Sequence, residues 1–171
     1  MTVLGGGNVE FIFNSISKYK TGITYTNWTT LGITVKDEAG DINLPVGDDY
    51  TQWEVDFQAQ DANGDGVMNG LNPANSLAFT AIEVSASVAA GCGTCNTYLS
   101  PFLPLTVLPT LLVDGTLGGA DQIEDFPSPE NLVFASDQIN ITYRCGAPPS
   151  TLLGTQADYY SDNIIFTLLM Q

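Results

Sequence analysis

The chain has 171 residues, of which 44% are hydrophobic, so it is long and apolar enough for one domain with a single core. Its 4 Lys and Arg residues stand against 19 Asp and Glu residues, and the resulting net charge of −15 argues against nucleic acid and anionic lipid as partners. The absence of His excludes Ser-His-Asp and Cys-His catalytic arrangements and His-based metal sites.

Hydrophobicity and composition bear on localisation. No run reaches the ~18 apolar residues needed to cross a bilayer, so we expect no membrane insertion. No signal peptide opens the chain, but a composition rich in Thr, Asn, Asp and Gly is typical of secreted bacterial surface proteins. We therefore expect an extracellular protein whose numbering starts at a mature or recombinant end.

The N-terminal stretch is a candidate for exchange between chains. Residues 1–7 end in three glycines, which predicts a flexible segment. Residues 8–16 alternate in hydrophobicity and lack Pro, which predicts a strand. This strand is either the first strand of its own domain or one donated to a neighbouring chain. Its apolar residues are Val9, Phe11, Phe13 and Ile16.

Short strands follow. Residues 22–26 and 31–37 predict two strands separated by Asn27-Trp28-Thr29. Residues 51–59 alternate most regularly, which marks a strand with one face in the core and one in water. The core-facing residues of this strand are Trp53, Val55, Phe57 and Ala59.

Residues 61–72 carry oxygen-bearing side chains at positions 1, 3, 5, 9 and 12 of a loop, with Gly66 at the sharp turn and Met68 directed toward the core. The loop resembles the calcium loops of dockerin modules and EF-hands, although strands rather than helices flank it. The expected calcium ligands are Asp61, Asn63, Asp65, the carbonyl of Val67, Asn69 and Asn72. Asn72 replaces the usual acid, so we expect modest affinity. Alternatively, the Asn-Gly and Asp-Gly pairs are ordinary hairpin-turn residues.

The remaining segments also predict strands. Apolar residues recur at odd positions in residues 77–81 and at even positions in residues 82–88, and this switch within one strand indicates a β-bulge. Residues 102–113 are interrupted by Pro and favour an edge strand or a crossing segment. Further strands are expected at 132–134, 139–143 and 164–169. The chain is therefore predicted to be all-β, with residues 8–171 forming one immunoglobulin-like Greek-key β-sandwich of about 8–10 strands.

Three cysteines are present. Cys92 and Cys95 form a C-x-x-C unit, but a zinc site would need further ligands, and a redox pair would need a βαβ setting. We expect one structural disulfide joining Cys145 to Cys92 or Cys95, with Cys95 preferred.

The closing run, residues 159–168, resembles the last strand of bacterial fimbrial subunits and spore-coat-U-like surface proteins. This resemblance implies an immunoglobulin-like sandwich that polymerises outside the cell, with an N-terminal segment completing the sheet of its neighbour. We therefore expect a non-enzymatic subunit of an extracellular filament or adhesive fibre whose partners are copies of itself, with a glycan or host surface as a further partner. The alternative is a calcium-stabilised carbohydrate-binding module that uses Trp28 or Tyr159, and a third reading is a virion surface protein.

Overall fold

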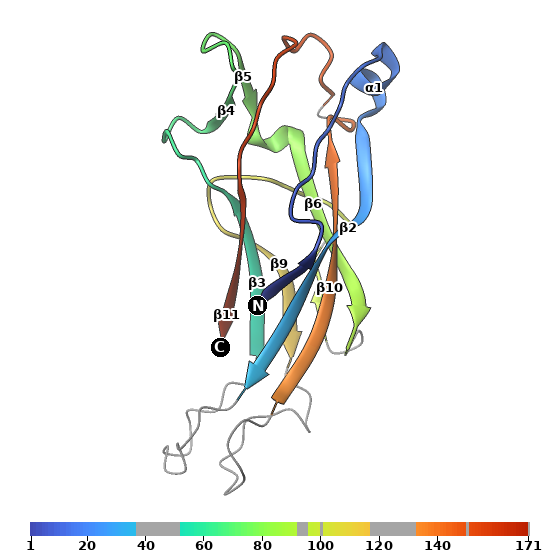
Figure 1. Cartoon of the computed structure of the whole chain (residues 1–171), viewed down its shortest axis with the longest axis vertical. Coiled ribbons are helices and arrows are strands. Elements are labelled where there is room, and N and C mark those ends of the chain that lie inside the picture. The colour runs from blue at the N-terminus through green and yellow to red at the C-terminus, as the bar shows by residue number, and fades with distance from the viewer. Residues whose placement is uncertain (37–51, 92–95, 100, 117–132, 150, 171) are drawn as a thin grey trace, which may run out of the picture.

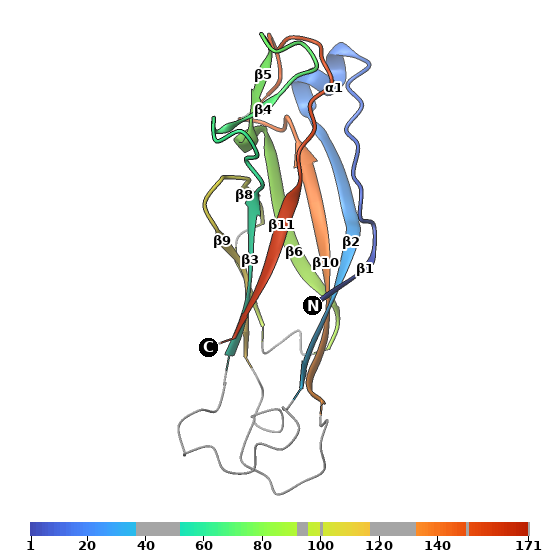
Figure 2. The same cartoon turned by 60° about the vertical axis from the view of Figure 1, so that its left-hand side comes forward.

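The computed structural model describes residues 1–36, 52–91, 96–99, 101–116, 133–149 and 151–170 as two antiparallel β-sheets packed face to face (Figures 1 and 2). The first sheet contains, in spatial order, β1 (Thr2–Gly5), β2 (Ile23–Lys36), β10 (Val133–Cys145), β6 (Ile82–Ala90) and β8 (Leu103–Pro104). The second sheet contains β11 (Ile164–Met170), β3 (Gln52–Ala59), β9 (Thr110–Thr116) and β7 (Thr97–Tyr98). A separate hairpin pairs β4 (Val67–Asn69) with β5 (Ser76–Ala78).

The chain passes repeatedly from one sheet to the other. From β6 onward, each strand lies in the sheet opposite to that of the strand before it. The prediction of an all-β sandwich is confirmed, whereas an immunoglobulin-like Greek-key path stays a prediction. Because each sheet is built from strands distant in sequence, neither sheet forms from local hairpins alone.

The core lies between the two sheets. The alternating residues of β3 are buried as predicted, with Trp53 and Val55 0% exposed, Phe57 1% and Ala59 2%. The opposite sheet contributes Leu31, Ile33, Val84, Ile139 and Ile141. The indole of Trp53 lies flat against Gly115, where a Cβ atom would come within 2.1 Å of the ring. Glycine at this position therefore allows the largest core side chain to fit.

β2 and β10 are each one long strand where the sequence predicted two. The break expected at residues 27–29 is instead an irregularity inside β2, where Asn27 has a φ of 51°. The register with β10 shifts between Ile141 and Tyr143, opposite this point. Asn tolerates the left-handed conformation, so the strand bends without ending.

Two further predictions need correction. The phase change near residue 81 comes from a short 3₁₀-helix, η1 (Phe79–Ala81), and not from a bulge. The segment predicted to be an edge divides into β8, which is an edge strand, and β9, which lies between β3 and β7. Within β9, Leu112 and Val113 are fully buried.

The N-terminus also differs from the prediction. Residues 2–5, predicted to be flexible, pair with β2 as β1. The Leu4 side chain lies over Gly32, where a Cβ atom would come within 3.1 Å of it. Residues 8–14 are extended but belong to no strand, and α1 (Ile16–Thr21) follows them. Ser15 caps this helix by accepting a hydrogen bond from the Lys18 N–H. Within the described residues, no helix is long and apolar enough to cross a membrane.

Candidate functional site

On one side of the sandwich, the edge strand of one sheet faces the edge of the other sheet across an open space. Among the residues that the structure describes, β11 is the last strand of its sheet and pairs with β3 alone, while β2 pairs on its outer side with β1 through Thr30, Leu31 and Gly32. Residues 6–14 run along this side toward α1, and residues 155–163 descend on its other flank into β11 (Figures 1 and 2). We call this space, with residues 6–14 in it, the edge groove.

The segment in the edge groove is anchored by alternate side chains. Val9 and Phe11 pack against the main core, and Phe11 and Phe13 pack against a smaller cluster around Cys145. Between them, Glu10 is exposed and Ile12 is 52% exposed. The predicted alternation is therefore present as a burial pattern although no strand forms. Ile16, predicted to belong to the same set, lies on α1 and is 73% exposed, so it is not part of the anchor.

Among the described residues, the backbone carbonyls of this segment accept hydrogen bonds from side chains and not from the backbone of a neighbouring strand. The Thr29 hydroxyl donates to the Gly6 carbonyl, and the Trp28 indole N–H donates to the Asn8 carbonyl at 2.5 Å. Lys18 Nζ donates to the Ile12 carbonyl at 3.1 Å. Within the described chain, residues 6–14 form no backbone ladder with either flanking strand. The segment therefore fills the groove without belonging to a sheet.

The glycine stretch is hydrogen-bonded to the sandwich through Thr29. The Thr29 hydroxyl that donates to Gly6 itself accepts a hydrogen bond from the buried Tyr143 hydroxyl at 3.0 Å. Gly6 has a φ of +67°, and a Cβ atom there would come within 1.9 Å of the Trp28 carbonyl oxygen. Glycine is required because the chain turns here from β1 into the edge groove.

Within the described part of the chain, the edge of β11 that faces the groove pairs with no other strand. The Asn163 carbonyl accepts the Gln60 N–H of the neighbouring chain segment at 2.9 Å. In an antiparallel pair of strands, one residue directs both its N–H and its C=O toward the partner strand, and the next residue directs both groups away from it. The residues that point away from β3 are therefore Ile164, Phe166, Leu168 and Met170, given the register of the two strands. On the outer face of this strand, Ile165 is 36% exposed and Leu169 is 40% exposed.

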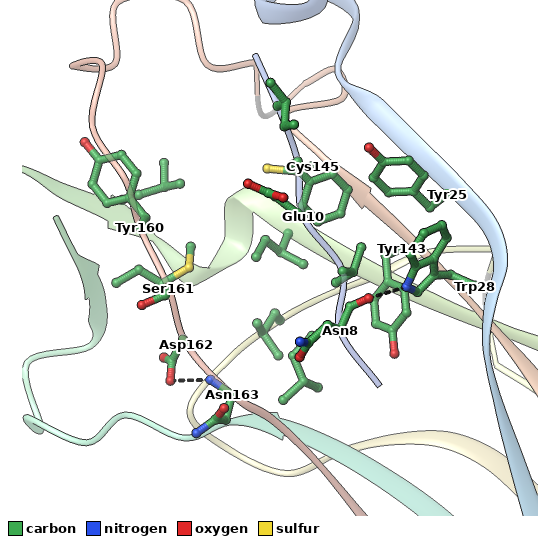
Figure 3. A pocket seen from close by; sticks show the side chains of 18 of the residues that line it. Asn8, Glu10, Tyr25, Trp28, Tyr143, Cys145, Tyr160, Ser161, Asp162 and Asn163 are labelled. Atoms are coloured by element: carbon green, nitrogen blue, oxygen red, sulfur yellow. Dashed lines mark hydrogen bonds between the residues drawn. The ribbon is translucent and has the colours of Figure 1, made fainter. Parts of the chain in front are cut away.

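A cavity of about 970 Å³ lies under the edge groove, between residues 6–13 and residues 155–164 (Figure 3). Its interior is lined by core side chains, among them Leu31, Leu105 and Phe166. Its rim carries Glu10 and Asp162, which project from the two facing segments (Figure 3). Burial, followed by the nearby Asp61 carboxylate, raises the pKa of Asp162, although the hydrogen bond from the Asn163 N–H opposes this shift.

The predicted calcium loop is closed by its own hydrogen bonds. The Asp61 carboxylate accepts backbone N–H groups from Gly64 at 2.9 Å, Asp65 at 3.2 Å and Gly66 at 2.8 Å. Gly66 has a φ of +79°, as the sharp turn requires. Met68 is 3% exposed and anchors the loop in the core, as predicted.

The other predicted ligands do not all converge on one point. The Asp65 carboxylate accepts the Val67 N–H at 3.2 Å and the Asn69 side-chain amide at 2.6 Å, and Asn63 is exposed. The side-chain oxygen of Asn72 turns toward the following turn, where it accepts the Ala74 N–H. Among the residues that the structure describes, no cluster of three or more Asp, Glu, Cys or His could hold a metal. Asp61 and Asp65 thus supply two carboxylates, which is short of a full calcium shell.

Asp158, which the sequence analysis did not identify, fixes the end of this loop. Its carboxylate accepts the Asn72 N–H at 3.1 Å and the Asn75 side-chain amide at 2.9 Å. The hydrogen bond from Asn75, then the one from the Tyr159 N–H, lowers the pKa of Asp158. Gly70 lies directly against it, since a Cβ atom there would come within 2.3 Å of the carboxylate. No spacing rule links residues so distant in sequence.

Calcium binding at residues 61–72 stays a prediction with a small expected effect. With a Kd on the order of 10⁻³ M, 5 mM calcium would stabilise the folded chain by about 1 kcal/mol. We expect a correspondingly small rise in Tm when calcium replaces EDTA in a calorimetric scan, and no rise for Asp61→Asn. An identical Tm for the original chain in both buffers would rule out the site.

The predicted disulfide from Cys145 to Cys92 or Cys95 stays a prediction, because Cys92 and Cys95 lie outside the described residues. The thiol of Cys145 is described and is buried, with the residue 4% exposed.

A scan against models of protein families finds no match to this chain, and a search of curated proteins finds none either.

Proposed function

We propose that this protein is a structural subunit of an extracellular filament or adhesive fibre in which copies of the chain join by exchanging residues 8–14. The observation that supports this most directly is the edge groove. An apolar alternating segment occupies the space between two strand edges and contributes its side chains to the core, yet within the described residues its backbone joins neither sheet.

The same contacts are available from a second copy. Val9, Phe11 and Phe13 would enter the groove of a neighbour as they enter their own, because exchange of an identical segment conserves its contacts. The outward main-chain groups of β11 would then gain hydrogen bonds that the segment does not make within its own chain. Exchange therefore favours association, because it adds backbone hydrogen bonds between β11 and the segment of the neighbouring chain.

The exposed edge itself supports this proposal. β11 carries apolar residues on its outer face and, as an edge strand, has no Pro and no Lys to discourage pairing with another chain. Natural proteins usually protect such an edge, so an unprotected one at the groove is consistent with a pairing surface.

Electron microscopy and light scattering test the proposal. We expect the purified chain to form filaments in negative stain, and a variant lacking residues 1–16 to be monomeric by size-exclusion chromatography with light scattering. A variant lacking only residues 1–5 is the control, because it removes β1 and keeps the segment. Filaments that persist without residues 1–16 would contradict the exchange.

A second candidate is a carbohydrate-binding module, because aromatic side chains meet at the surface of β2. Trp28 is 43% exposed, and its ring centroid lies 5.1 Å from that of Tyr25. Tyr159, on the opposite flank of the groove, is 57% exposed. Such rings can stack on sugars. Glycan-array binding that disappears with Trp28→Ala would favour this function over assembly.

A further inference from the structure

We propose that the cavity under the edge groove binds a small amphipathic molecule, namely an alkyl chain that ends in an ammonium group. This inference concerns the chain whose own residues 6–13 line the cavity, and it does not require assembly. It rests on the size of the cavity, its apolar interior and the sign of the charge at its rim.

The interior suits an alkyl chain. The volume of about 970 Å³ lies within the range of ~300–1,000 Å³ typical of small-molecule sites. Leu77, Ile82 and Leu105 line it from beneath, and Phe166 lines it from β11. An alkyl chain among these side chains would be removed from water without leaving a buried polar group unpaired.

The rim selects a positive head group. Glu10, Asp158 and Asp162 line the cavity, and no Lys or Arg is among its lining residues. Lys18, on the neighbouring α1, donates to the Ile12 carbonyl and does not line it. Asp158 accepts hydrogen bonds from the Asn72 and Asn75 donors, and one oxygen of Asp162 accepts the Asn163 N–H (Figure 3). The exposed carboxylate of Glu10 and the second oxygen of Asp162 are therefore the groups at the rim that can contact an entering cation.

The raised pKa of Asp162 agrees with this selection. Burial and the Asp61 carboxylate both disfavour its charged form, so a cation nearby would relieve an unfavourable charge. A fatty carboxylate would add a further negative charge to the same rim. The overall net charge of −15 acts in the same direction over a longer range.

Three decyl probes with one chain length and different head groups test the proposal: decyltrimethylammonium, decanol and decanoate. Each is titrated into the full chain below its micelle concentration by calorimetry, and methyl NMR shifts of Leu105 and Ile82 locate the binding. We expect one molecule of decyltrimethylammonium to bind per chain, about tenfold more tightly than decanoate. Decanol should bind with intermediate affinity.

A matched pair of double variants separates the rim from the overall charge. Glu10→Gln with Asp162→Asn should reduce the preference for the cation to about threefold or less. Glu54→Gln with Asp56→Asn removes the same charge from the outer face of β3 and should leave the preference unchanged. Both pairs avoid the core residues, so folding is preserved and can be checked by circular dichroism.

Three results would overturn the proposal. Decanoate that binds as tightly as the cation would remove the role of the rim, and equal losses in the two double variants would assign the preference to overall charge. The third result is that the cation causes no methyl shift while the chain associates as its concentration rises. This would identify a second copy of the chain as the occupant of the cavity. Filament formation by itself bears only on the proposed function.

Discussion

Replacing Phe11 by Ser is expected to abolish assembly and to lower the free energy of unfolding by about 2–3 kcal/mol. Phe11 is half-buried and packs against both hydrophobic clusters, so its loss removes contacts and leaves a space that the groove cannot close. Ile12→Ser changes the neighbouring residue, which is 52% exposed, and should leave both properties nearly unchanged. Urea unfolding measures the stability, and light scattering measures the assembly.

The two effects of Phe11→Ser distinguish a role within the chain from a role between chains. If the segment only closes its own groove, the stability falls and any filaments remain. If it is exchanged, filaments disappear, and the unfolding midpoint of the original chain rises with protein concentration because association stabilises the folded state. Filaments that survive in Phe11→Ser alongside a concentration-independent midpoint would therefore refute the exchange.

The fold was predictable where burial decides local structure. The alternation at residues 53–59 produced a half-buried strand because every second side chain could be placed in the core. The same alternation at residues 9–13 produced the same burial but no strand. Periodicity reports which side chains leave water, and it does not report whether a backbone finds a partner. Residues 9–13 would become a strand only beside a free strand edge, and the sequence does not show which strands lie at an edge.

Features set by long-range contacts were not predictable. Asp158 acts on residues 70–75 through contacts that span more than eighty positions, with the Asn72 and Asp158 pair separated by 86. Asn27 looked like a turn residue, but pairing with β10 on both sides of it kept the strand continuous.

Raising the pH above 9 is expected to destabilise the protein through Cys145. Burial raises the pKa of this thiol from its usual 9.0 to about 12. Between these values the unfolded chain releases the proton and the folded chain keeps it, so the contribution to stability is complete below pH 9 and is lost as the pH rises toward 12. At 1.36 kcal/mol per unit, the loss reaches about 4 kcal/mol at pH 12.

Urea unfolding between pH 8 and pH 11.5, under reducing conditions, measures this loss. Cys145→Ala removes the titrating group, so its free energy of unfolding should fall less steeply with pH than that of the original chain, even though it starts lower at pH 8 because the cavity gains volume. Burial also raises the pKa of Tyr143, and this group titrates equally in both chains and cancels in the comparison. If the two curves stayed parallel across this range, the thiol would have to reach water in the folded state, and residues 8–14 would not close the groove above it.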